Sequence, residues 1–106
     1  MISALEKLIG TPRDGALLRY SLGLEYAKAG DAAKALVHLH EAVTRDPVYS
    51  AAWKALGKNL EALDRHAEAL DAYRQGIAAA KRKGDRQAEK EMTVFARRLE
   101  KKLSAP

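Results

Sequence analysis

Cysteine is absent from this chain of 106 residues, which excludes disulfide bonds and thiolate metal sites. Proline occurs three times and aromatic side chains six times, and β-branched residues are scarce beside the many alanines and leucines. Such a composition favours helices over strands. The length corresponds to about one domain, so we expect a single all-α domain over residues 1–106.

Long apolar segments are also missing. No apolar run approaches the roughly 20 residues of a membrane span. Residues 1–10 lack the basic start and the apolar segment of a signal peptide. We therefore expect a cytoplasmic protein without a membrane partner.

An excess of positive charge exists only towards the C-terminus. The formal net charge is +5. Residues 1–80 hold ten basic and ten acidic side chains, whereas residues 81–106 hold nine basic and four acidic side chains. Four of the basic residues recur at helical spacing, which predicts one stripe on a last helix: Arg86, Lys90, Arg97 and Lys101. Such a stripe either solvates a terminal helix or attracts an anionic partner.

A shift of 34 residues superimposes the chain on itself at several positions. Leu22-Gly23 falls on Leu56-Gly57, and apolar character is kept at three further pairs, namely Tyr26 with Leu60, Leu39 with Tyr73, and Val43 with Ile77. Self-similarity at such a period is typical of stacked helical repeats.

Each repeat predicts two helices. Gly30 favours a left-handed helix stop, Asp31 favours the cap of the next helix, and Pro47 limits that helix at its end. We expect an N-terminal helix within residues 1–10, helix pairs over 16–49 and 50–83, and a capping helix over 85–103. Asp85 would cap this last helix, whose predicted apolar stripe is Ala88, Met92, Phe95, Leu99 and Leu103.

With these residues in place, the chain resembles the tetratricopeptide-repeat (TPR) family, and in particular a small bacterial-type TPR protein. The first repeat supplies the matching residues Leu22, Gly23, Tyr26, Gly30, Ala35, Ala42 and Pro47, and the second supplies Trp53, Leu56, Gly57, Ala69 and Tyr73. The resemblance implies an α–α superhelix of two helix pairs between an N-terminal helix and a C-terminal capping helix.

Three departures and two glycines carry further expectations. Asp64 stands at the turn glycine and tolerates a left-handed conformation. Gly76 replaces an alanine, and Lys81 replaces the proline, so the second helix of that pair is expected to continue to about Gly84. Gly23 and Gly57 are expected to let the paired helices approach closely, and three large aromatic residues are expected in the core: Tyr26, Trp53 and Tyr73.

In the family that the chain resembles, the first helix of each repeat lines a concave peptide-binding groove. Carried over by position, the groove residues are Leu17, Tyr20, Leu24, Ala27 and Lys28 in the first repeat, and Ala51, Lys54, Lys58, Glu61 and Ala62 in the second. One half would be apolar and aromatic, and the other basic. The resemblance thus implies a partner protein or peptide with a short acidic and hydrophobic segment or a C-terminal carboxylate.

Catalytic and metal sites are not indicated. His38 and His40 lie on different faces of a helix, and His66 begins another helix. No acid–histidine–nucleophile set and no glycine-rich phosphate loop is recognisable. We expect no enzyme, no catalytic residue, no metal and no cofactor.

Two alternatives to a groove-binding scaffold stay open. The basic stripe would suit an anion- or nucleic-acid-associating module, although Phe95, the aromatic residue of that helix, falls on the apolar stripe, which argues against nucleic acid. The other alternative is a structural protein that forms a homo-oligomer through an exposed apolar end of the array.

Overall fold

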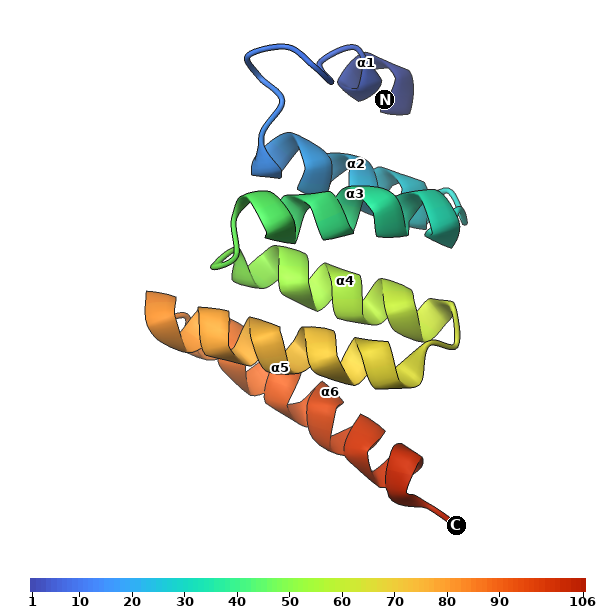
Figure 1. Cartoon of the computed structure of the whole chain (residues 1–106), viewed down its shortest axis with the longest axis vertical. Coiled ribbons are helices and arrows are strands. Elements are labelled where there is room, and N and C mark those ends of the chain that lie inside the picture. The colour runs from blue at the N-terminus through green and yellow to red at the C-terminus, as the bar shows by residue number, and fades with distance from the viewer.

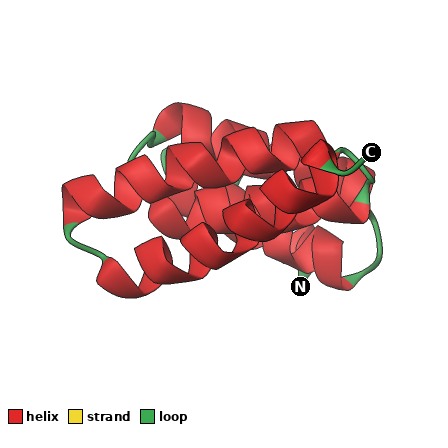
Figure 2. Cartoon of the chain, turned by 90° about the horizontal axis from the view of Figure 1, so that it is seen from below, coloured by secondary structure: helices red, strands yellow, loops and turns green.

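The computed structural model describes residues 1–106 and contains helices joined by short loops, with no strand (Figures 1 and 2). The expected fold class is confirmed. The helices are α1 (Ile2–Glu6), α2 (Ala16–Lys28), α3 (Ala32–Arg45), α4 (Ser50–Ala62), α5 (His66–Lys83) and α6 (Arg86–Ser104).

The helices stack into a flat, elongated array of 46 × 30 × 18 Å (Figure 1). Helices α2 and α3 form one antiparallel pair, α4 and α5 form the next, and α6 packs on α5. Helix α4 contacts both α2 and α6, whereas α3 and α5 do not touch each other. The array therefore closes on the side of α2, α4 and α6, which is concave, and opens on the side of α3 and α5.

The helix ends follow the sequence signals. Gly30 (φ 81°) and Asp64 (φ 58°) both adopt the left-handed conformation at the turn within a pair. The carboxylates of Asp31 and Asp85 accept hydrogen bonds from the backbone N–H groups of residues 34 and 88, as expected of helix caps. Helix α5 runs through Lys81 and ends at Gly84 (φ 73°), because no proline stops it earlier. The N-terminal helix is shorter than its apolar residues suggested, since residues 7–10 form a turn.

The two repeat glycines sit where paired helices touch. A Cβ on Gly23 would lie 2.5 Å from Cγ of Leu39, and a Cβ on Gly57 would lie 2.6 Å from Cδ1 of Tyr73. The expected close approach is confirmed at both positions. Gly76 has the same role, which the sequence did not reveal: a Cβ there would lie 2.7 Å from Cβ of Trp53 and would also overlap the sulfur of Met92.

The core runs through the array as one cluster, and two expectations about it are wrong. Tyr26 and Tyr73 are buried, but Trp53 is only half-buried. On α6 the buried residues are Ala88, Met92, Ala96 and Leu99. Leu103 keeps 46% of its surface exposed, because α5, on which α6 packs, does not reach the last turn of α6 as it diverges (Figure 1).

Candidate interaction surfaces

A groove lies between α2 and α4 on the concave side, with a volume of about 470 Å³. Helix α2 lines it with apolar side chains and α4 with small and cationic ones; the lining includes Tyr20, Leu24, Ala27, Ala51, Lys54, Ala55, Lys58 and Ala62. The groove therefore has an apolar wall facing a wall that carries two lysines.

Seven of the ten residues expected to form the groove line it: Tyr20, Leu24, Ala27, Ala51, Lys54, Lys58 and Ala62. The other three do not. Leu17 projects into solvent at the start of α2 with 67% of its surface exposed. Lys28 pairs with Glu25 at 3.5 Å near the N-terminal helix.

Glu61 lies outside the groove because its carboxylate bonds to other helices. The hydroxyl of Tyr73 donates to Oε2 of Glu61 at 2.6 Å, and Arg98 lies 3.4 Å from Oε1. Burial, together with this hydrogen bond, raises the pKa of Tyr73 well above its usual range. Glu61 thus connects α4 to α5 and α6.

Helix α6 also reaches the two groove lysines. Nζ of Lys54 lies 3.3 Å from Oε1 of Glu91, and Nζ of Lys58 lies 5.2 Å from the centre of the Phe95 ring. Lys58 has no carboxylate partner. Of the two, Lys58 therefore has its charge free for an anionic group.

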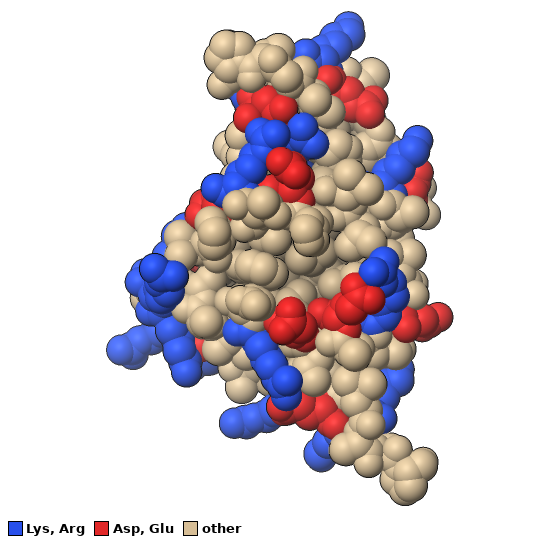
Figure 3. Space-filling model, viewed as in Figure 1, with Lys and Arg blue, Asp and Glu red and all other residues tan.

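The basic stripe of α6 faces solvent: Arg86, Lys90, Arg97 and Lys101 are all exposed. With four neighbouring cations they form a set that takes part in no ion pair, namely Lys81, Arg82, Lys83, Arg86, Lys90, Arg97, Lys101 and Lys102. Figure 3 shows blue side chains gathered at the left edge, at the level where α5 ends.

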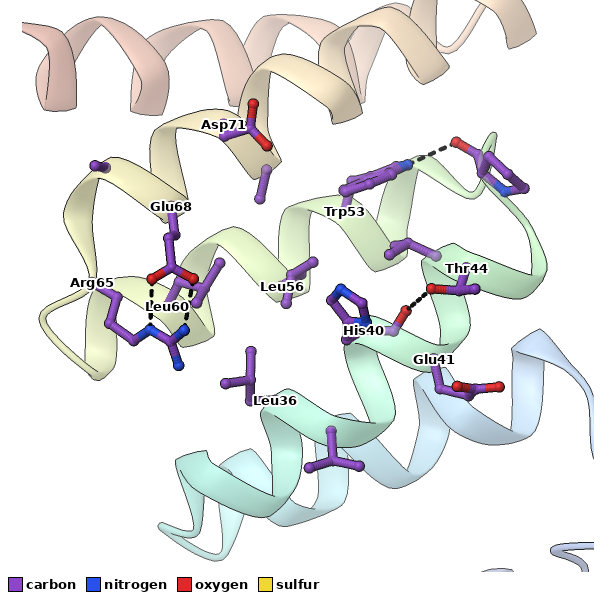
Figure 4. A pocket seen from close by; sticks show the side chains of 15 residues that line it. Leu36, His40, Glu41, Thr44, Trp53, Leu56, Leu60, Arg65, Glu68 and Asp71 are labelled. Atoms are coloured by element: carbon purple, nitrogen blue, oxygen red, sulfur yellow. Dashed lines mark hydrogen bonds and ion pairs between the residues drawn. The ribbon is translucent and has the colours of Figure 1, made fainter.

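A larger hollow of about 1020 Å³ opens on the convex side, between α3 and α5, with α4 as its floor (Figure 4). We call it the convex hollow. Its apolar lining includes Leu36, Val37, Val43, Trp53, Leu56 and Leu60. Helix α5 contributes the small side chains of Ala67 and Ala72. The hollow was not predicted from the sequence, although the small side chains of these two alanines are the signal that could have indicated it.

Acidic side chains surround the convex hollow. Glu41, Glu68 and Asp71 lie at its edge against one cation, Arg65 (Figure 4). Arg65 is held by Glu68 through hydrogen bonds of 2.9 and 2.7 Å. Asp71 is exposed and has no ion-pair partner. The hollow therefore carries negative charge in a chain whose net charge is +5.

The edge carboxylate of Glu41 is ionised and oriented. Arg45 donates a hydrogen bond of 2.8 Å to it, which lowers the pKa of Glu41. Arg45 also lies 3.1 Å from Oδ1 of Asp14. Because Arg45 is shared, the charge of Glu41 is only partly neutralised.

No three His, Asp or Glu side chains are grouped so that they could hold a metal ion. None of the helices is both long and apolar enough to cross a membrane.

The stacked helix pairs and the concave groove define a helical-repeat protein of the α–α superhelix class. The family model described as the bacterial transcriptional activator domain matches residues 15–102, and that model describes a related helical repeat. A TPR repeat-containing protein of Pseudomonas aeruginosa is 52% identical over 101 residues, which cover 95% of this chain and 96% of that protein. The chain belongs to the tetratricopeptide-repeat family.

Solved structures agree with this assignment. A protein of Bordetella parapertussis solved in solution has a TM-score of 0.80 and 42% identity, and the match covers 98% of this chain and 92% of that one. A TPR domain protein of Salinibacter ruber has a TM-score of 0.77 and 34% identity over 82% of this chain and 88% of that one. Proteins of this family are in general non-enzymatic and mediate protein–protein interaction.

Proposed function

We propose that the chain is a scaffold that binds a short peptide segment of another protein in the groove between α2 and α4. The observation that carries this proposal is that apolar side chains of α2 line the groove and are not fully covered by the rest of the chain. Helix α2 buries Leu18, Leu22 and Tyr26 in the core, yet it also presents the 37% exposed Leu24 and the half-buried Tyr20 to the groove. Apolar side chains beyond the core-facing stripe of a helix are candidates for contact with a partner.

The chemistry of the groove favours a segment with both apolar and acidic side chains. Tyr20 and Leu24 would contact the apolar residues, and Lys58 would meet a carboxylate that no group of the chain supplies. Lys54 would exchange Glu91 for the ligand or hold both. Charged partners of this kind mainly set orientation and association rate, while the apolar contacts supply most of the affinity.

The test compares matched substitutions on α2. Short peptides selected from a display library on the wild-type protein are measured by fluorescence anisotropy against Leu24→Asp and Leu17→Asp. Leu24 lies in the groove and Leu17 outside it, and both side chains are exposed, so neither change should unfold the protein. We expect Leu24→Asp to weaken binding roughly tenfold or more, and Leu17→Asp to leave it unchanged. Equal effects of the two substitutions would reject the groove.

A second candidate function, association with an anionic macromolecule through α6 and the end of α5, rests on the eight cations without ion pairs. Such binding should fall steeply between about 50 and 200 mM salt, because contacts to phosphates release counterions. Arg97→Glu would weaken it and reduce its dependence on salt, and would leave the groove peptide bound. Affinity for nucleic acid that does not change with salt would contradict this candidate.

A further inference from the structure

We infer that the convex hollow is a second docking site, which takes a basic amphipathic helix of a partner protein. This hollow and the concave groove share no lining residue. Helix α4 borders both, with Trp53, Leu56 and Leu60 towards the hollow and Lys54, Ala55 and Lys58 towards the groove. The site is therefore separate from the one proposed above and does not depend on it.

The hollow offers an anchor of the kind that dominates protein interfaces. The indole N–H of Trp53 donates to the carbonyl oxygen of Pro47 at 2.7 Å, so its polar atom is satisfied within the loop (Figure 4). What Trp53 presents to the hollow is its apolar ring, and the lining also includes Leu56 and the 63% exposed Val37. Aromatic side chains in such apolar depressions are typical binding hot spots.

Charge selects the partner. The edge carries Glu41, Glu68 and Asp71 and one lining cation, Arg65, whereas the excess positive charge of the chain lies in residues 81–106. Figure 3 shows this arrangement as a tan surface in the middle of the face, with red side chains above and below it. An apolar segment flanked by Lys or Arg would be attracted to this place and repelled by the cations near α6.

The walls select a helix rather than a strand. All three sides of the hollow are helices, whose backbone groups are already paired along most of their length. A segment that docks there gains no backbone hydrogen bonds from the walls, so it must satisfy its own. A volume of about 1020 Å³ corresponds to roughly two to three turns of a helix about 10 Å across.

The probe is a synthetic helical peptide of about five turns with leucine on one face and lysine on the other. A second peptide of the same length, with glutamate in place of every lysine, serves as the charge control. Binding is measured by isothermal titration calorimetry with the full chain. We expect the lysine peptide to bind and the glutamate peptide to bind at least tenfold more weakly. Equal affinity for the two peptides would overturn the inference.

Matched variants locate the peptide. Val37→Asp places a charge in the hollow, and Val94→Asp places the same charge on α6, where the valine is 62% exposed. We expect about tenfold weaker binding for Val37→Asp and no change for Val94→Asp. Equal effects of these two variants would also overturn it.

Charge reversal at the edge gives a second, independent readout. Asp71→Lys adds two positive charges at the hollow, and the double substitution Ser3→Lys with Ala4→Lys adds two at exposed positions of α1. Only Asp71→Lys should weaken the lysine peptide. A loss of binding in Lys58→Glu would place the peptide in the concave groove, and a dimer in sedimentation that Val37→Asp dissolves would assign the hollow to a second copy; either result rejects the inference.

Discussion

The two helix pairs have the same backbone arrangement, but different interactions hold the loop that precedes each pair against its first helix. In the first pair, Arg19 donates hydrogen bonds of 2.9 and 3.1 Å to the carboxylate of Asp14, in the loop before α2. At the same position of the second pair, Trp53 donates to the carbonyl of Pro47, in the loop before α4. One position of the repeat thus holds the preceding loop either through an ion pair or through a neutral indole.

The two helix pairs also differ in the side chain that faces the repeat glycine. Gly23 faces the flexible side chain of Leu39, whereas Gly57 faces the flat ring of Tyr73. The hydroxyl of Tyr73 donates a hydrogen bond to Glu61 and its ring is fully buried, so the ring has less freedom to move aside than an aliphatic side chain. The close approach of the paired helices is thus reached with a tolerant contact in one pair and a rigid contact in the other.

The largest effect is expected where the rigid contact is broken. Gly57→Leu would push a branched side chain into the ring of Tyr73 and should cost about 3 kcal/mol of unfolding free energy or more. The comparison variant is Asp64→Gly, at a position with φ 58° that glycine adopts without strain, and it should change stability by less than about 1 kcal/mol. Urea unfolding measures both, and similar midpoints would contradict the assignment of Gly57 to the helix contact.

A somewhat smaller effect is expected at the end of α5. Lys81→Pro would restore the residue that ends the first pair, but here it falls inside α5 and removes a helix hydrogen bond, at a cost of about 3 kcal/mol. It would also disturb the bond from the N–H of Asp85 to the carbonyl of Ala80, which positions the start of α6. Thermal melts should show a lower Tm for this variant than for Lys81→Ala, and equal values would mean that α5 frays before Lys81.

The smallest effect is a difference in acid sensitivity between the two pairs. The hydrogen bonds from Arg19 and from the backbone N–H of Gly10 hold the pKa of Asp14 well below its usual range. Because the folded-state pKa is lowered, this contribution is present above the unfolded pKa of about 3.9 and is lost as the pH falls below it. The protection of amides in the first pair, relative to their intrinsic exchange rates, should therefore fall below about pH 4 before that of the second pair does.

Asp14→Asn tests this difference, with the unpaired Asp71→Asn as control. We expect Asp14→Asn to lower the Tm at neutral pH and to flatten its dependence on pH between about 5 and 3. Asp71→Asn should behave like the wild type. If the Tm of Asp14→Asn depended on pH as the wild type does, the ion pair between Asp14 and Arg19 would not hold the loop before α2.

Local signals predicted most of the fold. Turn residues such as Gly30 and Asp64, the cap Asp85 and the missing proline at Lys81 act within a few residues of the chain, so their consequences could be read directly. The errors concern contacts between distant helices. Gly76 departs from the repeat pattern because Met92 of α6 lies against it, a contact that the pattern does not contain. Leu103 was wrongly predicted to be buried, because periodicity does not show where the neighbouring helix ends.

The groove was predicted only in part for the same reason. Position in the repeat placed Tyr20, Leu24, Lys54 and Lys58 correctly along it. It could not show that Glu61 would turn to Tyr73 and Arg98, or that Glu91 and Phe95 of α6 would reach the groove lysines. These contacts depend on how α6 lies across α4, which no short stretch of sequence encodes.

The packing of each helix on helices close to it in the chain also determines how the array forms. No pairing joins the first helices to the last, so no long loop must close before contacts become favourable, and chains of low contact order fold within milliseconds or faster. Opening should begin at the ends, since α1 has no buried residue, while α4, which touches α2, α3, α5 and α6, should exchange last. The helix that separates the two surfaces is thus the slowest part of the molecule to open.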